Sequence, residues 1–287
     1  MKRVAVLAAA AVLAGVAATG PASAGSPGSA VSLGRVGAIE YLKAVQPGVI
    51  TQEGLTADCD VEDSATGGGG TISGSPANSA LNRTAPSGAG DGWRAEGNTT
   101  GITSRKVTTY AICGHAEVAY SVAGGTVSPA GEFGDVTGTT QGCSESEIAL
   151  GGADNFGGNV RIVQNRPIGL TDWTVTAQNH ASVQGTYSIW YGCSDAYDVS
   201  RRAESTTVRR GDVGQATATC KRGEAVINGG FAMTAGGEPE RDTWATSTRP
   251  FDSDDRKKTP DDGWTVKAYN DGDAKAGLTV YAVCAAK

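Results

Sequence analysis

The feature that most constrains this chain is a segment that recurs three times in diverged form. In each copy a tryptophan precedes a cysteine by 20 residues. An aromatic residue lies three positions before that cysteine, and a glycine pair or run lies eight or nine residues after an earlier cysteine. The matching pairs are Trp93–Cys113, Trp173–Cys193 and Trp264–Cys284, with the aromatic residues Tyr110, Trp190 and Tyr281. Such internal periodicity indicates a fold built from repeated units.

The six cysteines divide equally among the three copies. Because equivalent residues of a repeat make equivalent bonds, we predict the disulfides Cys59–Cys113, Cys143–Cys193 and Cys220–Cys284. Free or metal-binding thiols are the alternative, but no CxxC spacing is present. The predicted pairs close loops of 50 to 64 residues.

Residues 1–24 are typical of a secretory signal peptide, with a basic start, an apolar run and a small-residue cleavage site ending at Ala24. We therefore expect a secreted, extracellular protein without a membrane span, in a compartment where disulfides form. Residues 25–53 read as a partly disordered N-terminal extension. Within it, residues 38–45 are expected to form a helical turn or an edge strand.

Short β-branched runs with alternating polarity recur, while no long window has apolar residues at helical spacing, so we predict an all-β fold. WTVKAY (residues 264–269) and LTVYAV (residues 278–283) flank a turn-rich segment, as do the corresponding runs of the second copy. We expect each such pair to form a β-hairpin. A third strand after the glycines and a fourth before the first cysteine give four strands per unit, and about twelve in all.

We expect residues 54–287 to form one domain of three repeats, at 54–120, 135–199 and 213–287. Three disulfide-closed, four-stranded units around a pseudo-threefold axis would make a β-prism. A β-trefoil is the alternative, although its units are shorter, at roughly 40–50 residues, than the 77 to 84 residues observed here. Independent domains are disfavoured because so short a unit buries little surface.

The order of cysteine, glycine pair, Gly-Trp strand and aromatic residue before the second cysteine resembles a group of secreted actinomycete proteins of unassigned function. At the level of the fold, this threefold glycine-rich plan is similar to the vitelline membrane outer layer protein, a β-prism. The resemblance covers residues 59–284. It implies a fold and no activity, so no functional residue is carried over from it.

Charge and motifs exclude several classes of function. Without the leader the chain has 22 basic and 30 acidic residues, which disfavours binding to nucleic acid or to anionic membranes. No HExxH or GxSxG motif occurs, and His115 and His180 lie in expected loops. We therefore predict that the protein is not an enzyme. No cofactor is predicted other than calcium.

Two acidic loops are candidate ligand sites. Asp271 and Asp273 in the last connection could bind Ca²⁺, although the EF-hand spacing is absent and the equivalent loops lack the acids. Asp252 and Asp254 lie in the long insertion of the third repeat and are candidate ligand-binding residues, or carboxylates of a hydrolase. A solvated polar loop is the alternative in both cases.

Aromatic residues give the remaining candidates. The repeated Trp93, Trp173 and Trp264 are better explained as core residues than as exposed sugar platforms. Trp190, Tyr191 and Trp244 are candidate ligand contacts, since one of the adjacent pair must face outward.

We expect a non-catalytic binding module for glycans or another cell-surface component. A structural or protein-interaction role, as in a coat or inhibitor-like protein, and a carboxylate-dependent hydrolase are the alternatives. The first copy departs from the others at Arg94 and Glu96, and the third has the longest insertion. We therefore expect a single surviving site, near the third repeat.

Overall fold

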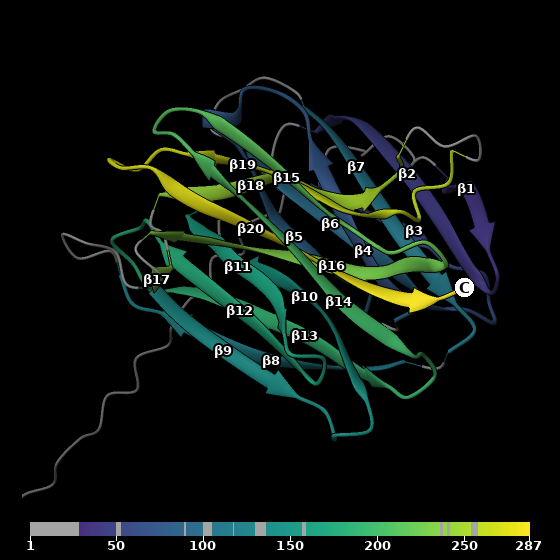
Figure 1. Ribbon diagram of the computed structural model, residues 1–287. Helices are drawn as coiled ribbons and strands as arrows, with labels where there is room; N and C mark the ends of the chain where they lie inside the picture. Colours follow the sequence, from purple (N-terminus) through teal and green to yellow (C-terminus); the bar gives the residue numbers. More distant parts are fainter. Residues whose placement is uncertain are drawn as a thin grey trace, which may run out of the picture.

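A computed structural model describes residues 29–49, 53–88, 90–99, 105–116, 118–129, 136–156, 159–235, 238–239, 242–253 and 258–287. Throughout these ranges the chain is all-β, as predicted, and forms three sheets (Figure 1). The one helical element in the described part is a single 3-10 turn at Pro76–Asn78. The predicted signal peptide lies outside the described residues.

We name the three sheets A, B and C, and list their strands in spatial order. Sheet A contains β1 (Val31–Val36), β2 (Ile39–Val49), β7 (Arg105–Gly114), β4 (Ser64–Ile72), β18 (Thr243–Phe251), β19 (Gly263–Asn270) and β15 (Val213–Thr219). Sheet B contains β3 (Glu53–Asp58), β6 (Gly92–Thr99), β5 (Ser79–Pro86), β10 (Ile148–Phe156), β13 (Gly185–Ser194) and β8 (Ala119–Val127). Sheet C contains β14 (Val199–Val208), β20 (Ala276–Ala286), β16 (Glu224–Ala235), β11 (Val160–Ile168), β12 (Asp172–Asn179) and β9 (Val136–Gly142), with β17 (Glu238–Pro239) paired to β16.

Each repeat is divided between two sheets. The first contributes β2, β7 and β4 to sheet A and β3, β6 and β5 to sheet B, and the other two repeats are divided in the same way. The halves of different repeats join through β4–β18, β5–β10 and β11–β16. The prediction of four strands per unit is therefore wrong, because in the described residues the three repeats have seven, six and seven strands, and each repeat pairs with both of its neighbours. The strand orders are linear, with an edge strand at each end, and do not match the trefoil alternative.

The predicted hairpins are also wrong. β12 lies in sheet C whereas the next strand, β13, lies in sheet B, and β19 and β20 likewise enter different sheets. The connection turns the chain from one sheet to the next. Asn179 begins one of these turns, because its side-chain oxygen accepts from the Ala181 N–H and its amide donates to the Val183 carbonyl. Asn270 makes the equivalent bonds to Gly272 and Ala274.

All three predicted disulfides are confirmed: Cys59–Cys113, Cys143–Cys193 and Cys220–Cys284. Each joins the two sheets that share its repeat. Cys143, for example, directly follows β9 of sheet C, and Cys193 lies in β13 of sheet B. The disulfides therefore tie neighbouring sheets together within a repeat.

The predicted N-terminal extension contains ordered strands. β1 and β2 extend sheet A, and β2 lies between β1 and β7. Residues 38–45 are therefore neither a helical turn nor an edge strand. The strands β2, β8 and β14 occupy equivalent positions, although they begin before the predicted repeat boundaries.

The repeated tryptophans are core residues, as the invariant spacing predicts. Trp93, Trp173 and Trp264 are at most 1% exposed. Each indole packs on a glycine of the facing sheet in its own repeat, where a Cβ would overlap the ring: Gly68, Gly151 and Gly229 respectively. Each indole N–H donates to a buried oxygen, of Thr84 (2.9 Å), Asn165 (2.7 Å) and Thr248 (2.8 Å) respectively. The glycine, the tryptophan and the acceptor form one interlocking unit.

One cluster of buried apolar side chains draws on all three sheets, for example through Ile112 of sheet A, Ile189 of sheet B and Ile227 of sheet C. At its centre β4, β10 and β16 approach one another. The Thr66 hydroxyl donates to the Ile227 carbonyl (3.2 Å), and the Asn228 amide donates to the Gly151 carbonyl (3.3 Å). Loops and outer sheet faces therefore surround a shared interior.

Candidate functional site on the outer face of sheet B

Trp190 lies on the outer face of sheet B. Its neighbours along β13 at positions 187 and 189 are buried in the core, whereas Trp190 itself is partly exposed. The adjacent Tyr191 extends from the opposite face, because its cross-strand partner Gly151 faces the Trp173 indole. The guanidinium carbon of Arg83 lies 5.4 Å from the Trp190 ring centroid, within cation–π range. Alternation thus places one aromatic residue of the predicted pair outward.

Arg83 belongs to a row of charged side chains across three strands. Its Nη1 lies 3.1 Å from Oδ2 of Asp154 on β10 and 4.0 Å from Oε1 of Glu96 on β6. Arg94 Nε donates to the same Glu96 oxygen at 2.6 Å. The side chains of Arg83 and Asp154 are only 14% and 2% exposed. This row fixes the guanidinium beside the Trp190 ring.

Burial dominates the electrostatics of this row. Desolvation raises the pKa of Asp154 to about 6, because the attraction of Arg83 offsets only part of that effect and Glu96 adds to it. The Arg83 Nε and Trp190 Nε1 atoms are buried and have no hydrogen-bond partner among the described residues. An unsatisfied buried donor is costly, which makes this cluster unfavourable for stability alone.

The charged pair occurs at only one of three equivalent places. The strands β5, β11 and β18 each have a register shift, and the residue that follows the shift is Arg83, Gln164 or Ser247 respectively. These three residues are therefore equivalent positions of the repeats. Across the repeat junctions these residues face Asp154, Ala232 and Thr71 respectively. In sheet A the pair is two hydroxyls, Thr71 and Ser247, 2.9 Å apart. Since two sheets form this junction without charge, the pair in sheet B is not needed for the fold, and we take it as the candidate functional site.

A shallow, open groove of about 640 Å³ adjoins the charged row. It is lined by small or hydroxyl-bearing residues and one tyrosine: Gly124, Gly125, Thr126, Thr186, Tyr187 and Ser188. Ser188 is the cross-strand neighbour of Asp154, so the groove begins where the row ends. Together they offer an aromatic ring, a fixed cation and hydroxyl groups, which can hold a polar ring-shaped ligand. Because the Asp154 carboxyl is buried against Arg83, it is suited to positioning the guanidinium rather than to acting on a substrate.

The other predicted aromatic contact, Trp244, is not an exposed platform. It is 4% exposed, and its indole N–H donates to the carbonyls of Pro76 (3.0 Å) and Ser79 (3.1 Å). The Arg161 guanidinium carbon lies 4.4 Å from the centroid of its ring. Trp244 therefore fastens a loop of the first repeat to β18. Asp252 is half-buried in the third-repeat insertion, and Asp254 lies outside the described residues.

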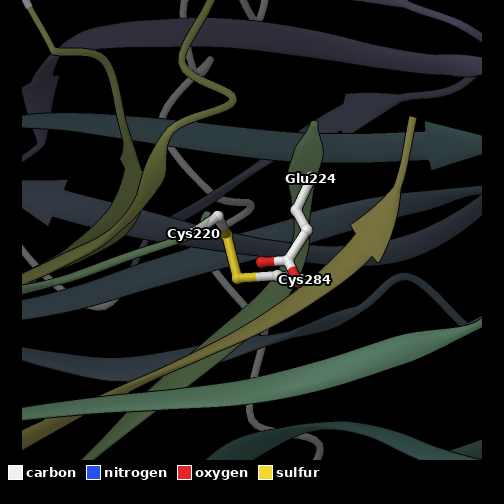
Figure 2. A group of neighbouring side chains, drawn as sticks. All are labelled: Cys220, Glu224 and Cys284. Carbon is white, nitrogen blue, oxygen red and sulfur yellow. A yellow bond between two sulfur atoms is a disulfide. The ribbon is translucent and has the colours of Figure 1, made fainter. Parts of the chain in front are cut away.

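The predicted calcium ligands are engaged separately. Asp271 is exposed and accepts from the Tyr269 hydroxyl at 3.4 Å, whereas Asp273 pairs with Arg210 at 3.1 Å. Within the described ranges, one group of three close potential metal ligands occurs, Cys220, Glu224 and Cys284 (Figure 2). Its two cysteines form a disulfide, and Arg202 pairs with the Glu224 carboxylate at 2.9 Å. This group is therefore a poor metal site.

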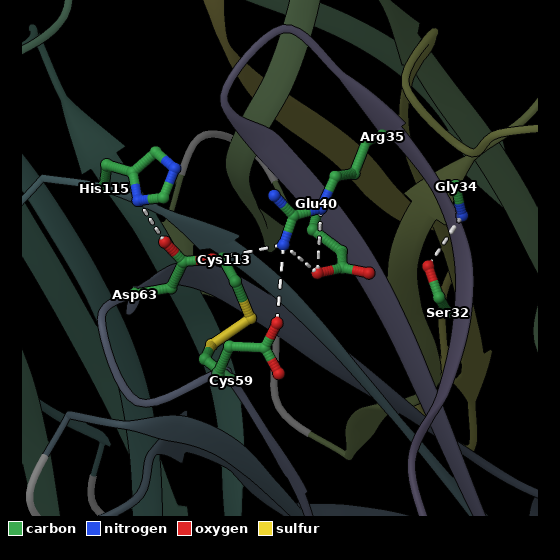
Figure 3. Close-up of polar contacts among 9 residues, drawn as sticks. Ser32, Gly34, Arg35, Glu40, Cys59, Asp63, Cys113 and His115 are labelled. Atoms are coloured by element: carbon green, nitrogen blue, oxygen red, sulfur yellow. Dashed lines mark hydrogen bonds and ion pairs between the residues drawn. A yellow bond between two sulfur atoms is a disulfide. The ribbon is translucent and has the colours of Figure 1, made fainter.

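His115 is exposed in the loop after β7, as predicted, and belongs to a charged cluster beside the Cys59–Cys113 disulfide (Figure 3). Its Nδ1 lies 2.6 Å from Oδ1 of Asp63, whose side chain is 1% exposed. Arg35 contacts the other Asp63 oxygen at 3.6 Å and Glu40 at 2.6 Å. Arg35 also lies 3.5 Å from Oδ2 of Asp60, so one guanidinium contacts three carboxylates and fastens the β1–β2 hairpin to the turn before β4.

The His180 side chain is 29% exposed, and its Nδ1 lies 3.4 Å from Oδ1 of Asp242. Burial lowers its pKa, and Asp242 counteracts this in part. The two histidines lie in separate clusters, and neither contacts a nucleophilic hydroxyl in the hydrogen bonds described.

In comparisons with known proteins, no family matches this sequence and no curated protein is significantly similar to it. Among the described residues, no helix has the length and apolarity needed to cross a membrane.

Two central residues of the site, Arg83 and Asp154, are not found by the sequence analysis. They come from different repeats and lie 71 residues apart, so no local motif joins them. Their partners Arg94 and Glu96 do appear in the sequence as departures of the first repeat. Those departures lie at the junction of the first and second repeats, beside the buried Arg83–Asp154 pair.

Proposed function

We propose that this protein is a secreted, non-catalytic binding module that holds a glycan, or a cell-surface component carrying one, on the outer face of sheet B. The observation that carries the proposal is the partly exposed Trp190 ring, fixed by Arg83 beside a hydroxyl-lined groove. Aromatic rings offer apolar area with a defined orientation, and a few fixed polar groups give specificity.

The scaffold supports this proposal. Three disulfides and the leader-like residues 1–24 are typical of exported proteins. Three sheets around a shared core resemble the arrangement of a β-prism, and we include that architecture in the proposal. Rigid strands rather than loops carry the site, which holds its side chains in one geometry.

Glycan-array screening of the disulfide-bonded protein, followed by calorimetric titration of the best neutral glycan, tests the proposal. We expect Trp190→Ala to weaken binding at least tenfold, as loss of a central aromatic contact does. Tyr110→Ala is the matched control, because Tyr110 holds the equivalent position on sheet A beside Arg249. It should leave the affinity unchanged.

Absence of glycan binding by the wild-type protein at millimolar concentration would contradict the proposal. So would equal losses in the two variants, because that result would separate binding from the sheet B face. Thermal midpoints of both variants identify any loss that arises from unfolding.

A further inference from the structure

The outer face of sheet C brings two arginines to one tyrosine. Arg166 of β11 and Arg201 of β14 have their guanidinium carbons 5.5 and 5.6 Å from the Tyr281 ring centroid. Arg166 comes from the second repeat, whereas Arg201 and Tyr281 come from the third. On the other two sheets the equivalent aromatic residue has one arginine over it, Arg83 on sheet B and Arg249 on sheet A. Among the residues that the structure describes, two arginines converge on one aromatic ring on sheet C alone.

Neutral acceptors hold both guanidinium groups in place. Arg201 Nη1 donates to the Pro167 carbonyl at 3.2 Å, and Arg166 Nε lies 3.4 Å from the Gln164 side-chain oxygen. Arg201 is exposed and Arg166 partly exposed. Each of these contacts uses one nitrogen of the guanidinium group. The other N–H groups are thereby held in position and can donate to a ligand.

Neither arginine has a carboxylate within ion-pair distance in the part of the chain that the structure describes. By contrast, Arg83 pairs with Asp154, Arg202 with Glu224 and Arg35 with Glu40. The chain has more acidic than basic residues, so the lack of a carboxylate beside these two arginines does not follow from its composition. Two like charges on one ring repel each other, and the ring face offsets only part of that repulsion.

We infer that Arg166 and Arg201 form a site for an oxyanion carried on a polysaccharide, such as a sulfate ester or a uronate carboxylate. The planar guanidinium fork matches both oxyanions with paired hydrogen bonds. The surrounding face of sheet C is polar, with the Thr140 and Thr174 hydroxyls 3.0 Å apart. This site lies on a different sheet from Trp190 and takes a charged ligand, so it goes beyond the proposed function and does not depend on it.

Binding to dextran sulfate, polygalacturonate and neutral dextran of matched length, measured by calorimetry at low and at high salt, tests the inference. We expect at least one polyanion to bind and neutral dextran not to bind at this site. Binding of dextran sulfate alone assigns a sulfate ester, and binding of polygalacturonate alone assigns a carboxylate. Salt should weaken the interaction, because charges on the surface are screened.

We expect Arg166→Gln and Arg201→Gln each to reduce polyanion affinity roughly tenfold, since each removes a charged hydrogen-bonding group. Arg249→Gln is the matched control. It makes the same change in charge above the single-arginine tyrosine of sheet A and should bind like the wild type. Trp190→Ala should also bind the polyanion normally, which distinguishes this site from the proposed glycan site.

Failure of both polyanions to bind the folded wild-type protein would overturn the inference. Equal losses in Arg166→Gln and Arg249→Gln would also overturn it, by showing a general charge effect. Circular dichroism of each variant verifies that the sheets remain folded.

Discussion

Single glycines decide how the three sheets approach one another. At Gly68, Gly151 and Gly229, the indole of the same repeat occupies the space that a side chain would need. This explains why a glycine pair and a tryptophan recur together in the sequence. The contact is a packing requirement, because interiors of this density do not accommodate an added methyl group without displacement.

We expect Gly151→Ala to destabilise the protein by about 1–3 kcal/mol, because the new Cβ overlaps the Trp173 ring. Gly124→Ala is the control, since the closest atom to a Cβ there lies at an ordinary contact distance of 3.8 Å. Urea unfolding measures both free energies. Equal values for the two variants would refute the packing explanation.

Asp154 should make stability depend on pH. Its pKa is raised from 3.8 to about 6 on folding, so the native state binds the proton more tightly than the unfolded chain. The resulting stabilisation is fully present below about pH 4 and is lost as the pH rises through about 6. Its size is about 3 kcal/mol at most. Between pH 4 and 7 the wild type should therefore lose more stability than Asp154→Asn, in urea titrations at each pH. Parallel pH profiles for the two proteins would contradict this expectation.

At the residue level, the sequence was sufficient to predict the cysteine pairs, the buried tryptophans and the outward position of one aromatic residue at 190–191. It was insufficient for Arg83 and Asp154. Their pairing depends on which repeat lies beside which, and the alternation within each strand does not contain that information.

The elements show the same limit. β12 and β13 alternate as a hairpin would, and the prediction of a hairpin followed from that pattern. Alternation reports which face of a strand is buried and does not report its hydrogen-bonding partner. Separate sheets for consecutive strands satisfy the same pattern, and the Asn179 and Asn270 turns redirect the chain between them.

The disulfides act at the scale of elements, because each ties a strand end of one sheet to its neighbour. Cys143→Ser with Cys193→Ser opens a loop of 50 residues, and the chain-entropy relation gives a loss of about 4 kcal/mol. Denaturant unfolding of the double variant measures that loss. A change below about 1 kcal/mol would indicate that the bond constrains the unfolded chain little.

The whole molecule depends on exchange between repeats. Sheets A and C both contain strands of the third repeat, so a chain that ends before residue 199 loses three of the seven described strands of sheet A and four of the seven of sheet C. We expect that truncated chain to remain unfolded and the intact chain to unfold in one calorimetric transition. Dispersed amide resonances from the truncated chain would show that the first two repeats fold without the third, contrary to this expectation.

The division of each repeat between two sheets has a consequence for how such a molecule can arise. A chain with one repeat would carry two half-sheets, each with an open edge that fits the other half of a second copy. Three separate chains could close the ring by exchanging halves, as a domain-swapped homotrimer with three identical faces. Joining the three into one polypeptide frees each junction to change alone. The buried Arg83–Asp154 pair and the two arginines at Tyr281 each occur at one junction. A symmetric trimer of identical chains would repeat any such feature at all three junctions.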